Sequence, residues 1–323
     1  MAYKVSGTES IKDDKTVVFE SITATVSRQA APSSPYTFQG STSGYRSGGL
    51  STNVIDKFPF ASDANATDVG NLIQALEGTS GQSSSSHGYV SGGSPPTTNV
   101  IQRFPFSSDN NATDVGDLTQ VIRNSAGHSS SAAGYVSGGL SSPPPSLRSN
   151  VIQKFSFAVD ENAIDVGDLT QSREDVTGQS SDASGYTSGG DAPPYTNLID
   201  KFPFSSDANA TDVGDLTQAR GGSAGQSSTT NGYTSGGNGP PYTNVIDKFP
   251  FSSDANATDV GDLTQARSNG AGQSSTASGY TSGGRVGIPN SNIIDKFPFS
   301  SDANATDVGD LTLETRGASG QQV

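Results

Sequence analysis

The amino-acid sequence predicts an all-β protein, a six-bladed β-propeller with an extended β arm at its N-terminus. The first observation is the motif Phe-x-Phe, which recurs at spacings of 46 to 51 residues and begins at Phe58, Phe104, Phe155, Phe202, Phe249 and Phe297. The second is Gly-Tyr-x-Ser-Gly-Gly, which accompanies each copy with its tyrosine at Tyr45, Tyr89, Tyr135, Tyr186, Tyr233 and Tyr280. Six such repeats are typical of propeller blades.

One repeat, residues 220–265, contains four short segments with strand patterns. They are GQSSTTN, GYTSGG, NVIDKFPF and ATDVGDLTQ, termed strands a to d. Each is bounded by Gly, Pro, Asn or Asp, which form turns. In strand c, Val245, Phe249 and Phe251 alternate onto one face and Ile246 onto the other, which predicts burial on both sides. Because proline lacks an N–H, we expect an edge or a bulge at Pro250.

A double glycine ends strand b in each repeat, for example Gly189-Gly190 and Gly236-Gly237. We expect these pairs at a crowded axis, where side chains have little room. In this feature residues 40–323 resemble kelch repeats, which implies four-stranded, kelch-like blades. Kelch blades also carry a characteristic tryptophan, and this chain has none.

The chain is predicted to form two parts, an attachment arm with a linker at residues 1–38 and a propeller at residues 39–323. The C-terminal TRGASGQQV matches the start of a repeat, so we expect it to join the first blade and close the ring.

Composition limits the function classes. Only 31% of residues are hydrophobic, but 14 Phe and 10 Tyr at regular intervals argue against disorder. The absence of Cys excludes disulfides and thiolate sites. A net charge of −14 argues against binding nucleic acid. No apolar run reaches the roughly 18 residues of a membrane helix, and the N-terminus lacks a signal-peptide pattern, so we expect synthesis in a host cytoplasm and no membrane insertion.

The segment SSDANATDVGDL recurs almost unchanged and is a candidate metal site. Asp207, Asn209 and Thr211 place oxygens at alternate positions, as in a calcium loop, but Asp212 stands where such a loop needs Gly. The segment also resembles the Asp-box of sialidase propellers, which implies a turn between the third and fourth strands. A repeated Asx turn is therefore the prediction, with calcium as the alternative, and no cofactor is predicted.

No catalytic residue is predicted, and the protein is not expected to be an enzyme. Acidic pairs such as Asp56 with Asp68 recur in several blades, whereas an enzyme normally has one asymmetric site. His87 and His128 occupy different positions in their repeats and are expected to be solvated.

Specificity is expected where the repeats differ. The b–c loops read LST, SPPTT, LSSPPPSLRS, DAPPYT, NGPPYT and RVGIPNS, and the d–a connections vary too. Both emerge on one face of a propeller, so Arg148, Tyr195, Tyr242 and Arg285 are the candidate partner-binding residues. Neutral drift is the alternative. The third repeat, with Phe155-Ser156-Phe157 and the longest b–c loop, is the first choice for a specific contact.

The N-terminal arm lies outside the repeats. TVVFESITATV has a strand pattern and RQAAPSSP that of a flexible linker, so the arm is expected to pair with another chain or an exposed edge. Residues 2–26 resemble the N-terminal segment of many structural proteins of tailed phages, especially marine and cyanobacterial ones. The resemblance implies a virion component fixed by its N-terminus.

The sequence therefore predicts a phage virion structural protein, associated with the tail or a fibre and present in multiple copies. Its partners would be other virion proteins, through the arm, and a host-surface protein or glycan. A kelch-like adaptor or a carbohydrate-binding lectin outside any virion is the alternative, and a propeller hydrolase is a third.

Overall fold

The computed structural model describes residues 10–11, 17–18, 38–142 and 146–323. The chain divides into two compact units, Met1–Pro35 and Tyr36–Val323. In the first unit, the short strands β1 (Ser10–Ile11) and β2 (Val17–Val18) pair in antiparallel orientation. Most of the predicted arm strand and the whole linker lie outside the described residues. Within the described ranges, no helix is long and apolar enough to cross a membrane.

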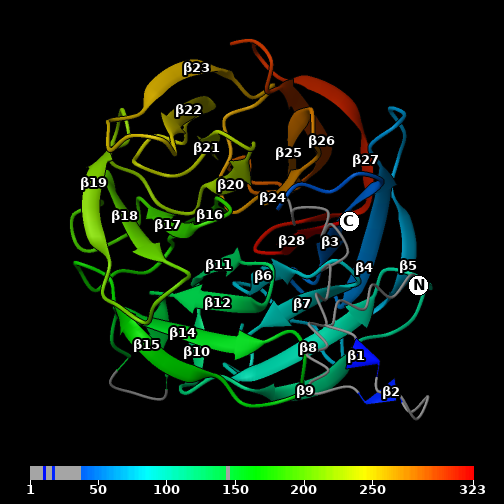
Figure 1. Cartoon of the computed structure of the whole chain (residues 1–323). Coiled ribbons are helices and arrows are strands. Elements are labelled where there is room, and N and C mark those ends of the chain that lie inside the picture. The colour runs from blue at the N-terminus through cyan, green and yellow to red at the C-terminus, as the bar shows by residue number, and fades with distance from the viewer. Residues whose placement is uncertain (1–9, 12–16, 19–37, 143–145) are drawn as a thin grey trace. The chain divides into compact units, whose positions relative to one another are not determined.

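The second unit consists of six four-stranded antiparallel sheets, which form the ring in Figure 1. We number these sheets blades 1 to 6 and letter their strands a to d from the centre outward. The predicted six-bladed propeller is thereby confirmed.

The inner strands a of blades 1 to 6 are β28 (Ser319–Gln322), β6 (Ser80–Ser83), β11 (Ala126–Ser129), β16 (Thr177–Ser180), β20 (Ala224–Ser227) and β24 (Ala271–Ser274). Strands b are β3 (Ser43–Ser47), β7 (His87–Ser91), β12 (Ala133–Ser137), β17 (Ser184–Ser188), β21 (Asn231–Ser235) and β25 (Ser278–Ser282).

Strands c are β4 (Val54–Pro59), β8 (Val100–Pro105), β14 (Val151–Ser156), β18 (Leu198–Pro203), β22 (Val245–Pro250) and β26 (Ser291–Pro298). The outer strands d are β5 (Thr67–Asn71), β9 (Thr113–Asp117), β15 (Ile164–Asp168), β19 (Thr211–Asp215), β23 (Thr258–Asp262) and β27 (Thr306–Thr315). A separate two-stranded sheet in blade 3 joins β10 (Ile122–Arg123) to β13 (Leu140–Ser141).

The C-terminal strand closes the ring. Strand β28 pairs with β3, with Ser319 opposite Ser47 and Gln322 opposite Gly44. The expectation that the C-terminal tail joins the first blade is confirmed. Closure removes the unpaired strand edge that an open array would leave in blade 1.

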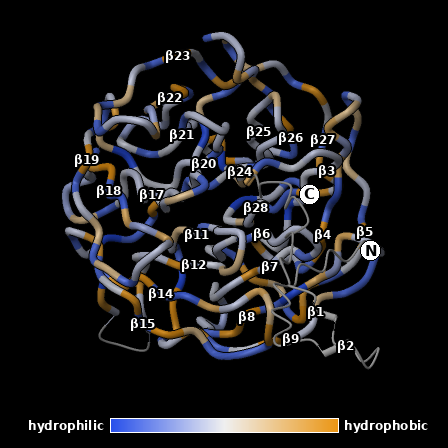
Figure 2. Tube along the Cα trace, in the orientation of Figure 1, coloured by the Kyte–Doolittle hydropathy of each residue, from blue (hydrophilic) through white to orange (hydrophobic). Residues whose placement is uncertain are grey.

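The hydrophobic core is divided into six clusters between neighbouring blades. In one of them Tyr186 of blade 4 stacks on Phe251 of blade 5, with ring centroids 4.8 Å apart, and Phe249 lies 5.5 Å from the same tyrosine. Ile246 packs in the next cluster, so strand c is buried on both sides as predicted. Figure 2 shows hydrophobic residues recurring around the ring on the middle and outer strands.

Strand c ends at its proline, and the bulge lies elsewhere. Strand β22 ends at Pro250, which still lies opposite Asn231 of strand b, while pairing with strand d ends at Lys248. The register shift falls between Ile246 and Asp247. The expected edge at Pro250 is thus present and the bulge is displaced toward the start of the strand.

The glycines at the crowded axis are those of strand a. The double glycines lie at the end of strand b, so the prediction that they lie at the axis is wrong. A methyl group at Gly225 would lie 2.1 Å from the carbonyl oxygen of Gly178 in the neighbouring blade. Gly236 and Gly237 instead have φ of 65° and 117° at the end of strand b, a left-handed conformation that favours glycine. A side chain on Gly236 would meet the carbonyl of Arg267.

Candidate functional site

The variable loops share one face of the propeller, as predicted. Isolated bridges join the d–a connection to the b–c loop within a blade, for example Glu174 to Asp191 and Gly221 to Asn238. The a–b and c–d loops are joined in the same way at the opposite end, where the N–H of Phe251 donates to the carbonyl of Thr230 at 2.9 Å. We call these two surfaces the loop face and the opposite face.

Three of the predicted contact residues occupy one equivalent position in successive b–c loops. Arg148, Tyr195 and Tyr242 each lie three residues before strand c of blades 3, 4 and 5. Arg285 lies at a different position, directly after the double glycine of blade 6. All four are partly exposed on the loop face.

Two of these side chains form hydrogen bonds with the next blade. Arg148 donates from Nε to the carbonyl of Asp191 and from Nη2 to its carboxylate, both at 2.9 Å. Tyr195 accepts a hydrogen bond from Nδ2 of Asn238 at 3.0 Å. In the described part of the chain, the Tyr242 side chain forms no hydrogen bond, and the Arg285 side chain donates only to the carbonyl of Gly287 at 2.9 Å. Tyr242 and Arg285 are therefore the more available to a partner.

An acidic cluster lies beside Arg148, and sequence reasoning missed it because its members come from two loops. Arg148 lies 3.1 Å from Glu174 as well as 2.9 Å from Asp191. Burial, with these two carboxylates adding to it, raises the pKa of Asp175 to about 6. Burial and the same carboxylates also raise the pKa of Tyr195.

The axis contains a small cavity of about 130 Å³, lined by the inner strands. At the loop face the cavity ends at six equivalent residues whose backbone has a left-handed conformation. They are Gly78, Asn124, Asp175, Gly222, Asn269 and Gly317. Their backbone groups are linked from blade to blade: the N–H of Asn269 donates to the carbonyl of Gly222 at 2.6 Å, and Gly317 donates to Asn269 at 2.8 Å.

The chain enters the propeller at the other end of this cavity. Phe38 lines the cavity, and Gln39 donates to the carbonyl of Ser227 at the end of an inner strand. The N–H of Gly40 donates to the carbonyl of Ser274 in the next blade. Residues 38–40 therefore lie at the axis on the opposite face, away from the variable loops.

One sequence deviation matches this point of attachment. In five blades the last residue of strand a is a serine, and in four of these the hydroxyl accepts the N–H of the preceding blade's serine, as from Ser180 to Ser227 at 3.0 Å. In blade 1 the residue is Gln322, whose Nε2 donates to the carbonyl of Phe38 at 2.9 Å. The sixfold pattern is thus broken where the incoming chain is held.

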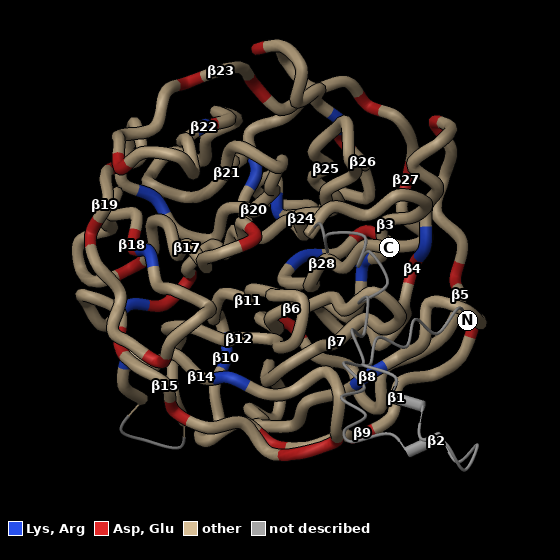
Figure 3. Tube along the Cα trace, in the orientation of Figure 1, with Lys and Arg blue, Asp and Glu red and all other residues tan. Residues whose placement is uncertain are grey.

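The repeated acidic segment joins neighbouring blades. Asp207 pairs with Lys154 of the preceding blade at 3.1 Å, and Oδ1 of Asn209 accepts the N–H of Asp168 at 3.1 Å. Asp212 accepts the N–H of Gly214, which is the predicted Asx turn. In the described ranges, no group of three or more His, Cys, Asp or Glu side chains could hold a metal ion. Figure 3 shows the acidic residues recurring along the outer strands.

The prediction for His128 is wrong, because its side chain is fully buried. It occupies the position that glutamine has in the other five inner strands, and its Nε2 lies 2.8 Å from the hydroxyl of Ser137. Its Nδ1 lies 3.2 Å from the carbonyl of Gln179. Burial lowers the pKa of His128 to about 4. His87 is half-buried beside Ser86.

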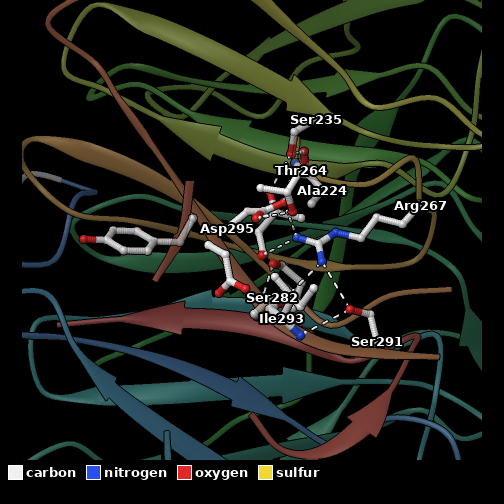
Figure 4. Close-up of polar contacts among 12 residues, drawn as sticks. Ala224, Ser235, Thr264, Arg267, Ser282, Ser291, Ile293 and Asp295 are labelled. Atoms are coloured by element: carbon white, nitrogen blue, oxygen red, sulfur yellow. Dashed lines mark hydrogen bonds and ion pairs between the residues drawn. The ribbon is translucent and has the colours of Figure 1, made fainter. Parts of the chain in front are cut away.

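Buried ion pairs are a second feature that sequence reasoning missed. Arg267 donates to Asp295 at 2.8 Å and to the carbonyl of Thr281 at 2.9 Å, and both charged side chains are almost fully buried (Figure 4). The same carboxylate accepts the N–H and hydroxyl of Thr264 from the preceding blade. Equivalent pairs are Arg173–Asp200 and Arg220–Asp247. Asp56, once a conceivable acid–base group, is likewise buried and paired with Arg46.

Comparison with known proteins identifies the fold. No protein-family model matches the chain, and no curated protein matches it. Among the solved structures that match is one described as the structure of YjhT, with a TM-score of 0.63 and 11% sequence identity over 76% of this chain and 86% of that one. The chain is thus a six-bladed propeller whose fold is similar to that of YjhT. At this identity the similarity concerns the fold alone.

Proposed function

We propose that the protein is a non-enzymatic structural component of a phage virion, in the tail or a fibre, where residues 1–38 anchor it and the propeller contacts a protein or a host surface. The observation that carries the proposal is that the chain joins the propeller on the axis of one face while the loops that vary lie on the other. A propeller held through that segment turns its variable loops away from its anchor. The resemblance of residues 2–26 to phage structural proteins supports the virion setting.

The contacts of the repeated polar residues support a binding role for the protein, and not a catalytic one. The acidic residues of the recurring segment join blade to blade or form turns, as Asp207 and Asp212 do. The buried carboxylates are paired with arginine, as Asp247 is with Arg220. What differs between blades is loop structure on a rigid scaffold, which is the usual arrangement of a recognition surface.

Tyr242 is the residue we expect to contribute most to recognition. Its hydroxyl has no partner among the described residues, and an aromatic ring with a free polar end suits contact with a protein or a sugar. Arg148 and Tyr195 would act mainly by holding their loops against the next blade.

The anchoring role is tested by deleting residues 1–35, which leaves Phe38 and Gln39 in place so that the propeller can still form. Particles are purified after complementation with each variant, and their protein content is measured by mass spectrometry. We expect the deletion to abolish incorporation and Tyr242→Ala, the control, to be incorporated at the wild-type level.

Two other outcomes would count against the proposal. Incorporation of the deletion variant would refute anchoring through the arm. Absence of the full-length chain from purified particles would refute the virion role and favour the adaptor or lectin alternative. That alternative predicts glycan-array or partner binding by the full chain that Tyr242→Ala weakens.

A further inference from the structure

The connection between strands c and d of blade 3 differs from the other five. Residues 155–165 read FSFAVDENAID, whereas residues 202–212 of blade 4 read FPFSSDANATD, as do the equivalents in blades 5 and 6. Val159 replaces serine, Glu161 replaces alanine and Ile164 replaces threonine at these positions. The departures introduce two branched apolar side chains and one carboxylate.

The departures leave the contacts between blades intact. Asp160 still pairs with Arg103 of blade 2, and Oδ1 of Asn162 still accepts the N–H of Asp117 at 3.0 Å. Asp165 still accepts the N–H of Gly167 at 3.1 Å, which preserves the Asx turn. The changed side chains take part in none of these three contacts.

The new apolar side chains face solvent. Val159 is 56% exposed and Ile164 is 57% exposed, so two of the six large apolar residues that are exposed in the described part of the chain lie in this one connection. Ile164 lines a groove of about 350 Å³ whose wall includes Ala132 from the a–b loop and Ala133 at the start of β12. We call this the blade-3 groove. Exposure of apolar surface to water is unfavourable, and a partner that buried this surface would gain the free energy of its transfer out of water.

The blade-3 groove lies on the opposite face, where the chain enters. The N–H of Phe157 donates to the carbonyl of Ala132 at 2.9 Å, which ties the c–d connection to the a–b loop. Glu161 is exposed at the groove, and no residue in the described ranges forms an ion pair with it, whereas the groove's Lys154 is paired with Asp207 at 3.1 Å. A complementary surface would therefore combine an apolar side chain with a nearby lysine or arginine.

We propose that the blade-3 groove docks on the virion protein that holds the arm, through an apolar side chain flanked by lysine or arginine, and so sets the rotation of the propeller about its axis. This rests on the proposed function. The c–d connections of the other five blades are nearly identical, so they offer a docking protein nothing that distinguishes one rotation of the ring from another. One distinct blade on the anchored face selects one of them.

The test replaces the three residues by those of blade 4, as Val159→Ser, Glu161→Ala and Ile164→Thr in one chain. These residues occur in the same connection elsewhere in the ring, so the variant is expected to keep the wild-type melting temperature. Particles carrying the variant or the wild type are compared by cryo-electron microscopy, with incorporation measured by mass spectrometry. The control carries Ser206→Ala and Thr211→Ser in blade 4.

We expect the triple variant to be incorporated at the wild-type level and to lose resolved propeller density, while the control retains it. A variant propeller as well resolved as the wild type, in the same orientation, would overturn the groove as a docking site and leave the anchoring role untouched. Absence of the wild-type chain from particles would overturn the proposed function and this inference with it. As a second variant, Glu161→Lys is expected to weaken the resolved density through charge repulsion, and no effect would contradict the proposed partner chemistry.

Discussion

At the residue scale, the buried site where the d–a connection meets strand c is filled in one of three ways, depending on the blade. Blades 4 to 6 pair an arginine of the d–a connection with an aspartate of strand c. Blade 1 has threonine in the d–a position and pairs Asp56 with Arg46 from strand b. Blades 2 and 3 carry no charge there and combine an apolar residue with glutamine, as Leu76 with Gln102 and Ile122 with Gln153.

These three combinations of side chains predict what happens when the combination of one blade is replaced by that of another. Arg220→Leu should lower the free energy of unfolding by about 3–5 kcal/mol, because Asp247 would remain buried without its partner. Adding Asp247→Gln should recover most of the loss, because it installs the combination found in blades 2 and 3. Urea unfolding of the three proteins measures both effects, and a double variant no more stable than the single one would contradict the interpretation.

The buried histidine predicts a loss of stability in acid. The unfolded chain binds a proton at His128 near pH 6.5, whereas the folded chain does so only near pH 4. Stability should therefore fall as the pH is lowered through this window, by about 3 kcal/mol at its lower end.

His128→Gln restores the residue of the other blades and should remove that contribution. Urea unfolding of the two proteins at pH 7 and pH 4 measures the difference, with His87→Asn as the control. An unchanged pH dependence in His128→Gln would show that other groups govern acid unfolding.

At the scale of elements, the inner strands are limited by how closely their backbones approach. A methyl group at Gly272 would lie 2.1 Å from the carbonyl oxygen of Gly225, a backbone atom that cannot rotate away. Gly270, two residues earlier, has a nearest neighbour at 3.1 Å in the methyl group of Thr281. A position inside β24 therefore excludes a side chain, whereas a position just before the strand can adapt to one.

Gly272→Ala should accordingly destabilise the protein by about 3 kcal/mol, the upper end of the usual overpacking range. Gly270→Ala, the matched control, should change stability by less than about 1 kcal/mol. Thermal unfolding of both variants compares them, and equal melting temperatures would contradict the steric limit.

At the scale of the whole molecule, the ring depends on a strand contributed by the far end of the sequence. Strand β28 completes blade 1, and Gln321 within this strand donates to the carbonyl of Tyr89 in blade 2 at 3.1 Å. Deletion of residues 319–323 should abolish the single cooperative unfolding transition, because blades 1, 2 and 6 all lose contacts. Deletion of residues 1–35 should leave it unchanged. Differential scanning calorimetry distinguishes these results, and a cooperative transition in the C-terminal deletion would refute closure as the stabilising device.

Much of the fold could be predicted because its signals are local. The period of Phe-x-Phe, the turn residues around each short strand and the Asx turn at Asp212 depend on neighbours in the sequence. The same locality predicted which loops share a face. Phage anchoring and partner binding at Tyr242 stay predictions.

The amino-acid sequence by itself determined the number of blades, their four strands and the C-terminal closure, because strand and turn preferences act over a few residues. Only the tertiary structure decided which glycines meet at the axis, that His128 is buried, and that Arg148 is held by the next blade. It alone shows that residues 38–40 join the propeller opposite the variable loops. These features depend on contacts between residues far apart in the sequence, whose geometry arises only when the ring is closed.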